Sequence, residues 1–325
     1  MRAIVIRDHG GPEVLQMDEV ADPVVEGEHV LVAVAATALN RADLLQRRGL
    51  YPDPRRPDPE IPGLEFAGTV VEVGRHVTDW RIGDRVMGIE TGSSCAERVV
   101  AHQRQLLRVP DSLTLGAAAA IPEVFLTAWD ALVVQGGLTS GRRALVHAGA
   151  SGVGTAAIQI ASAVGAWVAV TCSSSKRGVC SDLGADLVLE RSPHDWCSEL
   201  RAGAPDGVDV VLDVVGGEEA PRNLSVLAQQ GCIVQVGVMA GGRTSIDLGM
   251  LLARRARWIG TTLRSRPIEE KIALTRRFAT EVLPWFESGL LRPVIDRTMS
   301  WHEVAEAHRV MESNLNAGKI VLTID

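Results

Sequence analysis

A glycine-rich turn, HAGASGVG at residues 147–154, is the stretch of this chain whose residue types and spacing most directly suggest chemistry. An apolar run at 144–146 precedes it, and a small-residue segment with helical character follows at 152–165. A strand that ends in such a turn and leads into a helix presents unpaired backbone N–H groups and a positive dipole end, which favour a pyrophosphate. The match to GxGxxG is imperfect, because Ser151 takes the place of the second glycine. A tight turn without a ligand is the alternative. The surrounding strand and helix favour dinucleotide binding at Gly149, Gly152 and Gly154.

The second strand of the pattern ends in TCSSSKR, residues 171–177. An enzyme that uses NAD has a carboxylate at this place to bond the ribose 2′-OH. Here there is no acid, and Ser174, Lys176 and Arg177 could instead hold a 2′-phosphate through charge-assisted hydrogen bonds. The alternative is that the two cations belong to the solvated first turn of a helix, where the dipole disfavours them. The sequence therefore predicts NADPH as the cofactor.

The elements that must position these residues are indicated by a change along the chain in the spacing of apolar residues. Residues 1 to about 110 read as mostly strand, as in 28–37 and 68–74, and the five prolines of 51–63 predict an irregular, mobile loop. From about residue 123, buried strands alternate with helices, which predicts a parallel sheet covered on both faces. The predicted strands of that sheet are 143–148, 167–172, 208–216 and 231–238, with helices at 152–165 and 176–185. The chain then becomes charged and helical over 267–290 and closes with a strand within 317–325.

Composition narrows the class of protein. The chain has 325 residues, enough for two domains, and its net charge of −7 disfavours nucleic acid as the main partner. Its five cysteines form no CxxC pair, which indicates reduced thiols. The N-terminus lacks the apolar core of a signal peptide, and the apolar stretches look too interrupted to cross a membrane. We therefore expect a cytoplasmic protein without a membrane anchor.

Several segments resemble the quinone oxidoreductases of the medium-chain dehydrogenase/reductase superfamily, and most of all their p53-inducible branch. The segments are ALNRADLLQRRGLYP (38–52), PGLEFAGTVVEVG (62–74), AAAAIPEVFLTAWDAL (117–132), HAGASGVGTAAIQ (147–159) and NAGKIVL (316–322). In that branch the position of Ser151 is also serine. The resemblance implies an α/β fold: a mostly β GroES-like catalytic domain from residues 1–121 and 264–325, and a Rossmann doubly wound parallel sheet from 122–263. It also implies a cofactor and substrate cleft between these domains and a homodimer formed through 255–265.

The same resemblance indicates whether the chain has the ligands of a catalytic zinc. Zinc-dependent alcohol dehydrogenases share this fold, but the matching ligand positions here are Asn40 in place of a cysteine and Leu64 in place of a histidine. Glu65 remains, and one carboxylate does not supply the three protein ligands of a catalytic zinc. The four-cysteine structural lobe is absent too. We therefore expect zinc-independent chemistry and no metal ligands.

The resemblance places Asn40, Asp43 and Tyr51 near the nicotinamide as catalytic residues. Tyr51, the only tyrosine, is either a proton donor to the developing enolate or an aromatic lid on the cofactor. Asp43 has an ordinary structural explanation as an i,i+4 partner of Arg47. Arg191 stands where the family has a second 2′-phosphate contact, and a solvent-facing Arg191 would weaken the preference for NADPH. The full set of predicted cofactor-binding residues is Thr127, Gly149, Ser151, Gly152, Val153, Gly154, Ser174, Lys176, Arg177, Arg191, Gly237, Met239, Leu263, Ser265 and Asn314.

Two further side chains are expected to be structural. Cys95 could face the substrate, but a buried inert thiol fits it better. His147, beside the glycine turn, is expected to be packed or hydrogen-bonded to the backbone rather than to act as an acid.

The expected function is NADPH-dependent, zinc-independent transfer of hydride to quinones or reactive α,β-unsaturated carbonyls, which stabilise the resulting anion themselves. One alternative is an enoyl reductase in a biosynthetic pathway, because the same fold and hydride chemistry serve both. The other is an NADPH-binding protein with a structural or RNA-binding role and little turnover. The acidic balance and the lack of interleaved aromatic and basic residues count against RNA. The expected partner is thus a small-molecule substrate.

Overall fold

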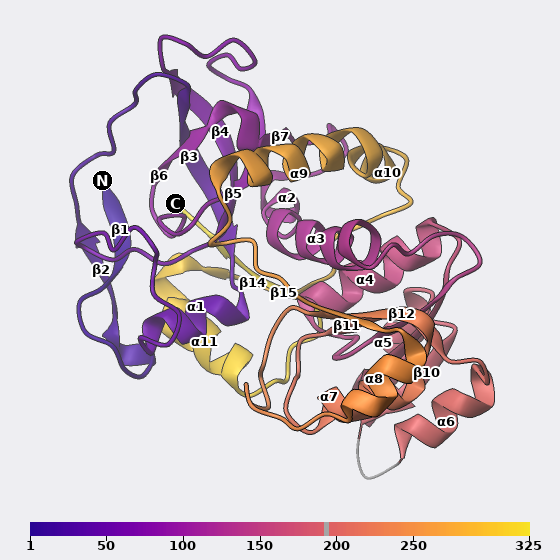
Figure 1. Ribbon diagram of the computed structural model, residues 1–325. Helices are drawn as coiled ribbons and strands as arrows, with labels where there is room; N and C mark the ends of the chain where they lie inside the picture. The colour runs from indigo at the N-terminus through magenta and orange to yellow at the C-terminus, as the bar shows by residue number, and fades with distance from the viewer. Residues whose placement is uncertain (192–194) are drawn as a thin grey trace. The chain divides into compact units, whose positions relative to one another are not determined.

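The computed structural model describes residues 1–191 and 195–325. These residues form two compact units (Figure 1), here called the mixed-sheet unit, Met1–Leu126 with Leu263–Asp325, and the parallel-sheet unit, Thr127–Thr262. Each unit has its own sheet and its own buried core.

The parallel-sheet unit is built on six strands that all run in the same direction. They are β8 (Arg143–Val146), β9 (Trp167–Cys172), β10 (Leu187–Glu190), β11 (Val208–Asp213), β12 (Leu227–Gln235) and β13 (Arg257–Gly260). The spatial order is β10-β9-β8-β11-β12-β13. Numbered along the chain this is 3-2-1-4-5-6, the order of a dinucleotide-binding fold, with its switch point between β8 and β11. The predicted doubly wound sheet is therefore confirmed.

Helices connect these strands because each parallel step needs a crossover. The helical segments of this unit are η3 (Asp130–Gln135), α4 (Gly152–Ala163), η4 (Ser174–Lys176), α5 (Arg177–Asp182), α6 (Trp196–Gly203), α7 (Glu219–Val226) and α8 (Leu248–Arg254). The core includes Leu145 of β8, Val211 of β11 and Ile233 of β12, all with no exposed surface, and Trp196 of α6 packs with them. Apolar residues on both faces of the strands explain the continuous apolar runs in the sequence.

The mixed-sheet unit contains a mostly antiparallel seven-stranded sheet and a two-stranded one. Its strands are β1 (Arg2–Ile6), β2 (Leu15–Glu19), β3 (His29–Ala38), β4 (Glu65–Val73), β5 (Arg85–Ile89), β6 (Arg98–His102), β7 (Leu106–Arg108), β14 (Ile295–Ser300) and β15 (Lys319–Thr323). The large sheet runs β14-β15-β3-β4-β5-β7, with β6 paired to β3. This pairing brings the last strand of the chain, β15, directly against β3.

The helical segments of the mixed-sheet unit are η1 (Pro12–Val14), α1 (Arg41–Arg47), η2 (Gln103–Gln105), α2 (Leu115–Ala118), α3 (Pro122–Trp129, which continues across the unit boundary), α9 (Ile268–Glu281), α10 (Leu283–Glu287), η5 (Trp301–Glu303) and α11 (Val304–Glu312). Helices α1 and α11, far apart in sequence, lie side by side (Figure 1). The predicted helical stretch 267–290 divides into α9 and α10, because Pro284 cannot donate a backbone hydrogen bond to the preceding turn.

The apolar stretch Leu115–Gln135 differs from what we expected of the sequence. It is 21 residues long with a mean hydropathy of 1.6, which is long and apolar enough to cross a membrane. In the structure, 78% of the most apolar 18-residue window within it is buried. A core helix of a globular protein has the same length and composition, so this burial accounts for the segment.

Candidate functional site

The glycine-rich turn after β8 is shaped by close packing against β9. The N–H of Gly149 donates to the carbonyl of Thr171 at 2.9 Å, and a side chain at Gly149 would place its Cβ 2.7 Å from the Cβ of Val170. A Cβ at Gly154 would lie 2.3 Å from the carbonyl oxygen of Ala148. Both glycines are therefore required by the fold of the turn itself.

Ser151, the apparent departure from GxGxxG, is the N-cap of α4. Its Oγ accepts a hydrogen bond from the N–H of Gly154 at 3.0 Å. Capping by a serine hydroxyl stabilises the start of a helix while the first N–H groups, here those of Gly152 and Val153, have no partner within the helix. The serine thus replaces a glycine without closing the end of the helix to an anion.

The other predicted cofactor residues of this unit follow the carboxyl ends of the parallel strands. Ser174, Lys176 and Arg177 follow β9, Arg191 follows β10, and Gly237 and Met239 follow β12. Because all six strands are parallel, these segments share one edge of the sheet with the glycine turn, where ligands of such folds bind. Thr127, in α3, is buried.

The cationic segment after β9 is open to solvent. Ser174 and Arg177 are exposed, and Lys176 is half-buried in the short helical turn η4. Arg191 is also exposed, which is the situation that we expected to weaken a preference for NADPH, and its backbone N–H donates to the carbonyl of Cys172 at 3.0 Å. These residues follow the carboxyl ends of β9 and β10.

The mixed-sheet unit holds a buried polar cluster formed by Asn40, Glu65 and Lys319. The Lys319 ammonium lies 2.8 Å from Oε1 of Glu65 and donates to Oδ1 of Asn40 at 2.7 Å. The Asn40 amide donates to the same Glu65 oxygen at 2.9 Å. Lys319 and Glu65 are almost completely buried, so each charge depends on the other for compensation.

Asp43 caps helix α1 and is also buried. Its carboxylate accepts hydrogen bonds from the backbone N–H of Asn40 at 2.7 Å and of Gly63 at 3.1 Å. Burial raises the pKa of the Asp43 carboxyl to about 6. The expected pair with Arg47 is wrong, because Arg47 donates instead to the carbonyl of Gly10 and to Glu312 of α11.

Tyr51 is held by Arg264. The Arg264 guanidinium donates to the Tyr51 carbonyl at 2.8 Å and lies 5.1 Å from the centre of the Tyr51 ring. It also donates to Thr91 at 2.6 Å and to Oε1 of Gln46 at 2.8 Å. Removal from solvent raises the pKa of the half-buried Tyr51 hydroxyl, which therefore stays protonated at neutral pH. The proline-rich loop is anchored at its Tyr51 end through a single buried arginine.

Glu123, at the start of α3, adds a further carboxyl to this region. Its backbone N–H donates to Oε2 of Glu65 at 2.8 Å. Loss of solvent and the neighbouring Glu65 carboxylate raise the pKa of the Glu123 carboxyl to about 8. It is therefore mostly protonated at neutral pH.

The remaining predicted residues of the mixed-sheet unit are dispersed. Leu263 is buried and Ser265 exposed, on either side of Arg264, and Asn314 is exposed in the turn after α11, where its side-chain oxygen accepts from Arg41 at 2.6 Å. Cys95 is buried, and burial raises the pKa of its thiol, as expected of an inert cysteine.

His147 is buried and packed, as expected, but its partners are side chains rather than the backbone. Its ring nitrogens lie 2.9 Å from Thr171 Oγ1 and 2.6 Å from Asn223 Oδ1. Its ring packs edge-on against Trp196 at 5.2 Å.

The donor set at the expected zinc position does not suit zinc. Asn40 and Leu64 provide neither thiolate nor imidazole, and the ammonium of Lys319 already neutralises Glu65. Across residues 1–191 and 195–325, no group of three or more His, Cys, Asp or Glu side chains is placed to hold a metal ion.

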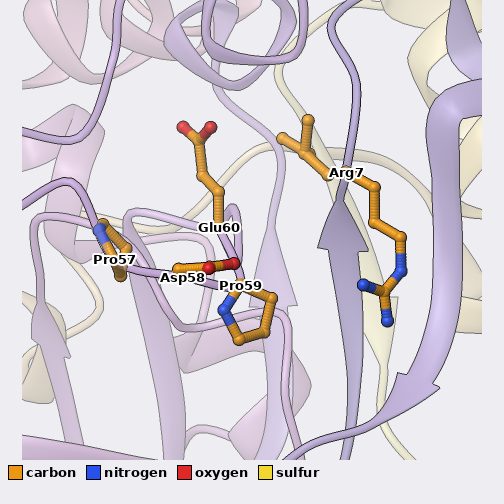
Figure 2. Close-up of a pocket in the computed structure, with 6 residues that line it drawn as sticks. Arg7, Pro57, Asp58, Pro59 and Glu60 are labelled. Atoms are coloured by element: carbon orange, nitrogen blue, oxygen red, sulfur yellow. The ribbon is translucent and has the colours of Figure 1, made fainter.

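A hollow of about 250 Å³ lies between the end of β1 and the proline-rich loop. Figure 2 shows Arg7 with Pro57, Asp58, Pro59 and Glu60 around it, and Ile6 completes the lining. None of the predicted site residues lines it. Glu60 of its lining accepts from Gln46 at 2.9 Å, and Gln46 in turn accepts from Arg264 at 2.8 Å.

Sequence reasoning missed Lys319, Glu123 and Arg264 as members of the site. Lys319 carried a signal, since it is one of three lysines in the chain and begins an apolar strand. Glu123 and Arg264 carried none, because their partners lie on distant segments.

A parallel sheet of this strand order, with a glycine-rich turn after its first strand, is typical of dinucleotide-binding proteins. The model of the alcohol dehydrogenase GroES-like domain matches residues 26–136, and that of the zinc-binding dehydrogenases matches residues 183–322. The mixed-sheet unit is thus GroES-like, and the chain has the medium-chain dehydrogenase/reductase fold.

Curated relatives agree with this architecture. The quinone oxidoreductase of Lama guanicoe is 32% identical over 100% of this chain and 98% of its own length. The synaptic vesicle membrane protein VAT-1 homolog of Rattus norvegicus is 31% identical over 99% of this chain and 84% of its own length. The chain belongs to the medium-chain dehydrogenase/reductase superfamily and is an oxidoreductase of that family.

Solved structures are similar along their full length. Mycobacterial Rv1454c complexed with NADPH superposes with a TM-score of 0.90 at 29% identity, covering 100% of both chains. The CurK enoyl reductase superposes with a TM-score of 0.90 at 26% identity, covering 100% of this chain and 99% of that one.

Proposed function

We propose that this protein is an NADPH-dependent, zinc-independent reductase that transfers hydride to quinones or to reactive α,β-unsaturated carbonyls. The observation that carries the proposal is the Asn40–Glu65–Lys319 cluster, in which Asn40, the residue that the resemblance matches to a zinc ligand, is an amide bonded to the Lys319 ammonium. An acceptor that stabilises its own anion requires no Lewis acid, so a metal-free site of polar side chains is sufficient. The likeness to a quinone oxidoreductase supports this acceptor class.

NADPH is the proposed cofactor. Bound at the capped end of α4, its pyrophosphate would meet the N–H groups of Gly152 and Val153. Its 2′-phosphate would be held by the side chains of Ser174, Lys176 and Arg177 after β9, because TCSSSKR has no carboxylate to repel it, and the exposed Arg191 after β10 would contribute less. The NADPH complex of a similar structure supports the assignment. When bound, this cofactor supplies the hydride.

Asn40, Asp43 and Tyr51 are the proposed catalytic residues. Arg264 keeps the Tyr51 hydroxyl on an anchored segment, and the raised pKa of Tyr51 keeps its proton available to a developing oxyanion. We assign Tyr51 as the proton donor rather than as a lid. Asn40 and Asp43 form the capping box that fixes the start of α1.

The second candidate is an enoyl reductase acting in a biosynthetic pathway. The observation that favours it is the similarity to the CurK enoyl reductase along the whole chain. Hydride transfer to an enoyl carbonyl compound would use the same cofactor edge and the same proton donor, so the acceptor alone distinguishes the two functions.

A homodimer is the proposed assembly. Strand β13 ends the order of the parallel sheet and leaves one edge of backbone N–H and C=O groups unpaired within that sheet. Leu248 and Leu252 of the adjoining α8 are exposed. Pairing two such edges would bury both features. Sedimentation of the purified protein measures its mass and thereby tests for a dimer.

The test of the proposed function is oxidation of NADPH and of NADH by the purified protein with 1,2-naphthoquinone, 1,4-benzoquinone and a simple enone. We expect quinone-dependent turnover with NADPH to exceed that with NADH by about tenfold, the equivalent of about 1.4 kcal/mol. Turnover with the enone alone supports the enoyl reductase. Binding of NADPH without oxidation by any acceptor contradicts both enzymatic assignments, and unchanged activity after treatment with a zinc chelator is required by the metal-free mechanism.

A further inference from the structure

Four buried polar side chains form a continuous chain of hydrogen bonds in the parallel-sheet unit. They are Thr171 near the end of β9, His147 after β8, Asn223 of α7 and Asp213 at the end of β11, and each is at most 1% exposed. The His147 ring lies 2.9 Å from Thr171 Oγ1 and 2.6 Å from Asn223 Oδ1. Asn223 donates to Oδ2 of Asp213 at 3.0 Å. The chain therefore links the carboxyl ends of three strands of the sheet.

The hydrogen bonds of this chain run in one direction. Because the Asp213 carboxylate only accepts hydrogen bonds, the Asn223 amide turns its Nδ2 toward Asp213 and its Oδ1 toward His147. His147 Nε2 therefore carries the ring proton and donates it to Asn223. Nδ1 of the ring then accepts the hydroxyl proton of Thr171. The orientation of the other three side chains thus follows from the carboxylate of Asp213.

The other oxygen of Asp213 holds the loop that follows β11. Oδ1 accepts hydrogen bonds from the backbone N–H groups of Val215 at 2.6 Å and of Gly216 at 3.0 Å. Gly216 has a φ of +65°, and a Cβ at this position would lie 2.9 Å from the carbonyl oxygen of Gly241. Only glycine tolerates both the backbone conformation and the close approach. The Asp213 carboxylate therefore stabilises a tight loop that lies directly against the segment after β12.

The loop after β11 in turn holds the segment after β12. The N–H of Met239 donates to the carbonyl of Val214 at 3.3 Å, and the N–H of Ala240 donates to that of Val215 at 2.8 Å. Val238 and Met239 are 53% and 49% exposed although both are apolar. This segment therefore presents apolar side chains at the edge of the sheet where ligands of such folds bind, and a flat ring can pack on them.

We propose that Asp213 is a positioning residue for the nicotinamide half of NADPH, and that Asn223, His147 and Thr171 keep its carboxylate oriented. This inference rests on the proposed function. In a sheet of order 3-2-1-4-5-6, each half of the sheet binds one half of a dinucleotide, on either side of the switch point. The cationic segment proposed for the 2′-phosphate follows β9, in the first half. The loops that Asp213 orders follow β11 and β12, in the second half, and thus serve the nicotinamide.

The first experiment compares Asp213→Ala with the wild-type protein by calorimetric titration with NADP⁺ and with adenosine 2′,5′-bisphosphate, which lacks the nicotinamide half. Alanine leaves the N–H groups of Val215 and Gly216 without their acceptor, so binding must then order the loop. We expect the Kd of NADP⁺ to rise by about tenfold and that of the bisphosphate to stay within about twofold. Equal losses for the two ligands would show that Asp213 only supports the fold and would overturn the proposal, as would an unchanged Kd of NADP⁺.

The matched control is Asp209→Ala, the same substitution at the amino end of the same strand. The Asp209 carboxylate accepts a hydrogen bond from the N–H of Arg143 at 2.8 Å, at the opposite edge of the sheet. We expect the Kd of both ligands to equal that of the wild type. A loss of NADP⁺ binding in Asp209→Ala as large as that in Asp213→Ala would overturn the assignment to Asp213.

A second variant, Asp213→Asn, tests the chain while keeping the shape of the side chain. Asparagine still accepts from Val215 and Gly216, but its amide donates where the carboxylate accepted. Asn223 must then turn over, and His147 must carry its proton on Nδ1 rather than Nε2. Nitrogen NMR of the histidine rings reads this position, with His147→Gln to assign the signal. We expect the proton to move and the Kd of NADP⁺ to stay within about threefold. A His147 proton on the same nitrogen in both proteins would overturn the chain, whether or not Asp213→Ala folds.

These measurements separate the inference from the proposed function, because none of them requires turnover. If the wild type binds NADP⁺ but reduces no acceptor, the proposed reaction fails and the binding comparison still decides the role of Asp213. If the wild type binds neither ligand, the proposed cofactor and this inference are both overturned.

Discussion

The ammonium of Lys319, on the last strand of the chain, lies 2.8 Å from a carboxylate oxygen of Glu65 on β4. Both side chains are almost fully excluded from solvent, and Asn40 bonds to both of them. This pair ties the C-terminal strand to the start of α1 and fixes the position of Asn40.

Replacing Lys319 with methionine should strongly destabilise the protein. The change keeps the length of the side chain but leaves the buried Glu65 carboxylate uncompensated, and breaking a buried pair costs about 3–5 kcal/mol in free energy of unfolding. Denaturant titration measures the loss. The double variant with Glu65→Gln removes both charges and should recover most of it. A loss below about 1 kcal/mol in Lys319→Met would show that the pair is not buried as the structure has it.

Replacing Arg264 with lysine should weaken use of the acceptor more than binding of NADPH. Lysine keeps the charge but cannot reproduce the guanidinium that holds Tyr51, Gln46 and Thr91 at once. We expect kcat/KM for the quinone to fall by about tenfold or more, because a misplaced catalytic group loses rate steeply. Equal kcat/KM in variant and wild type would contradict the anchoring role.

Removing the cations after β9 and β10 should change the choice of cofactor. In the variant Lys176→Ala with Arg191→Ala, we expect KM for NADPH to rise by about tenfold to a hundredfold, as for the loss of charge-assisted hydrogen bonds. KM for NADH, which lacks the 2′-phosphate, should stay nearly constant. Steady-state kinetics with both cofactors provide the test. Parallel losses for NADPH and NADH would show that these side chains support the fold rather than recognise the phosphate.

Replacing Glu123 with glutamine should alter how stability depends on pH. The pKa of Glu123 is about 8 in the folded chain and near the ordinary glutamate value after unfolding. The folded state thus binds the proton more tightly. The contribution of the Glu123 carboxyl to the free energy of unfolding is fully present below about pH 4 and is lost as pH rises toward about 8. Urea titrations at both ends of that range should show the variant gaining stability relative to the wild type at the higher pH. A difference between the two proteins that stays constant with pH would contradict the raised pKa.

Replacing Ser151 with alanine should cost about 1 kcal/mol, the usual contribution of an N-cap hydroxyl. The hydroxyl accepts from Gly154 at 3.0 Å, and alanine leaves that N–H unpaired. Ser162→Ala, an exposed position of the same helix, provides the control and should be nearly neutral. Thermal unfolding of the two variants checks the difference. Equal stability of both would mean that Ser151 does not cap α4 in solution.

The sequence by itself determined the parallel-sheet unit to a large extent. Apolar runs of strand length separated by helical segments are local patterns, and β8, β9, β11 and β12 appear where those runs predicted them. The strands β10 and β13 were not predicted, although they are as long as β8. The glycine turn was also recognisable locally, since its shape depends on residues within a few positions of each other.

Only the tertiary structure decided which charges meet. Arg47 is four residues from Asp43 on one helix, yet it pairs with Glu312 of α11. The Asp43 carboxylate is already bonded to two backbone N–H groups, one of them in the capping box of α1. Lys319 meets Glu65 only because β15 pairs with β3, and β3 with β4. A buried charge is stable only beside its compensating partner, and such partners come from segments that the fold brings together. The local sequence therefore determined the elements and the cofactor turn, whereas the long-range packing determined the protonation and partners of the polar cluster.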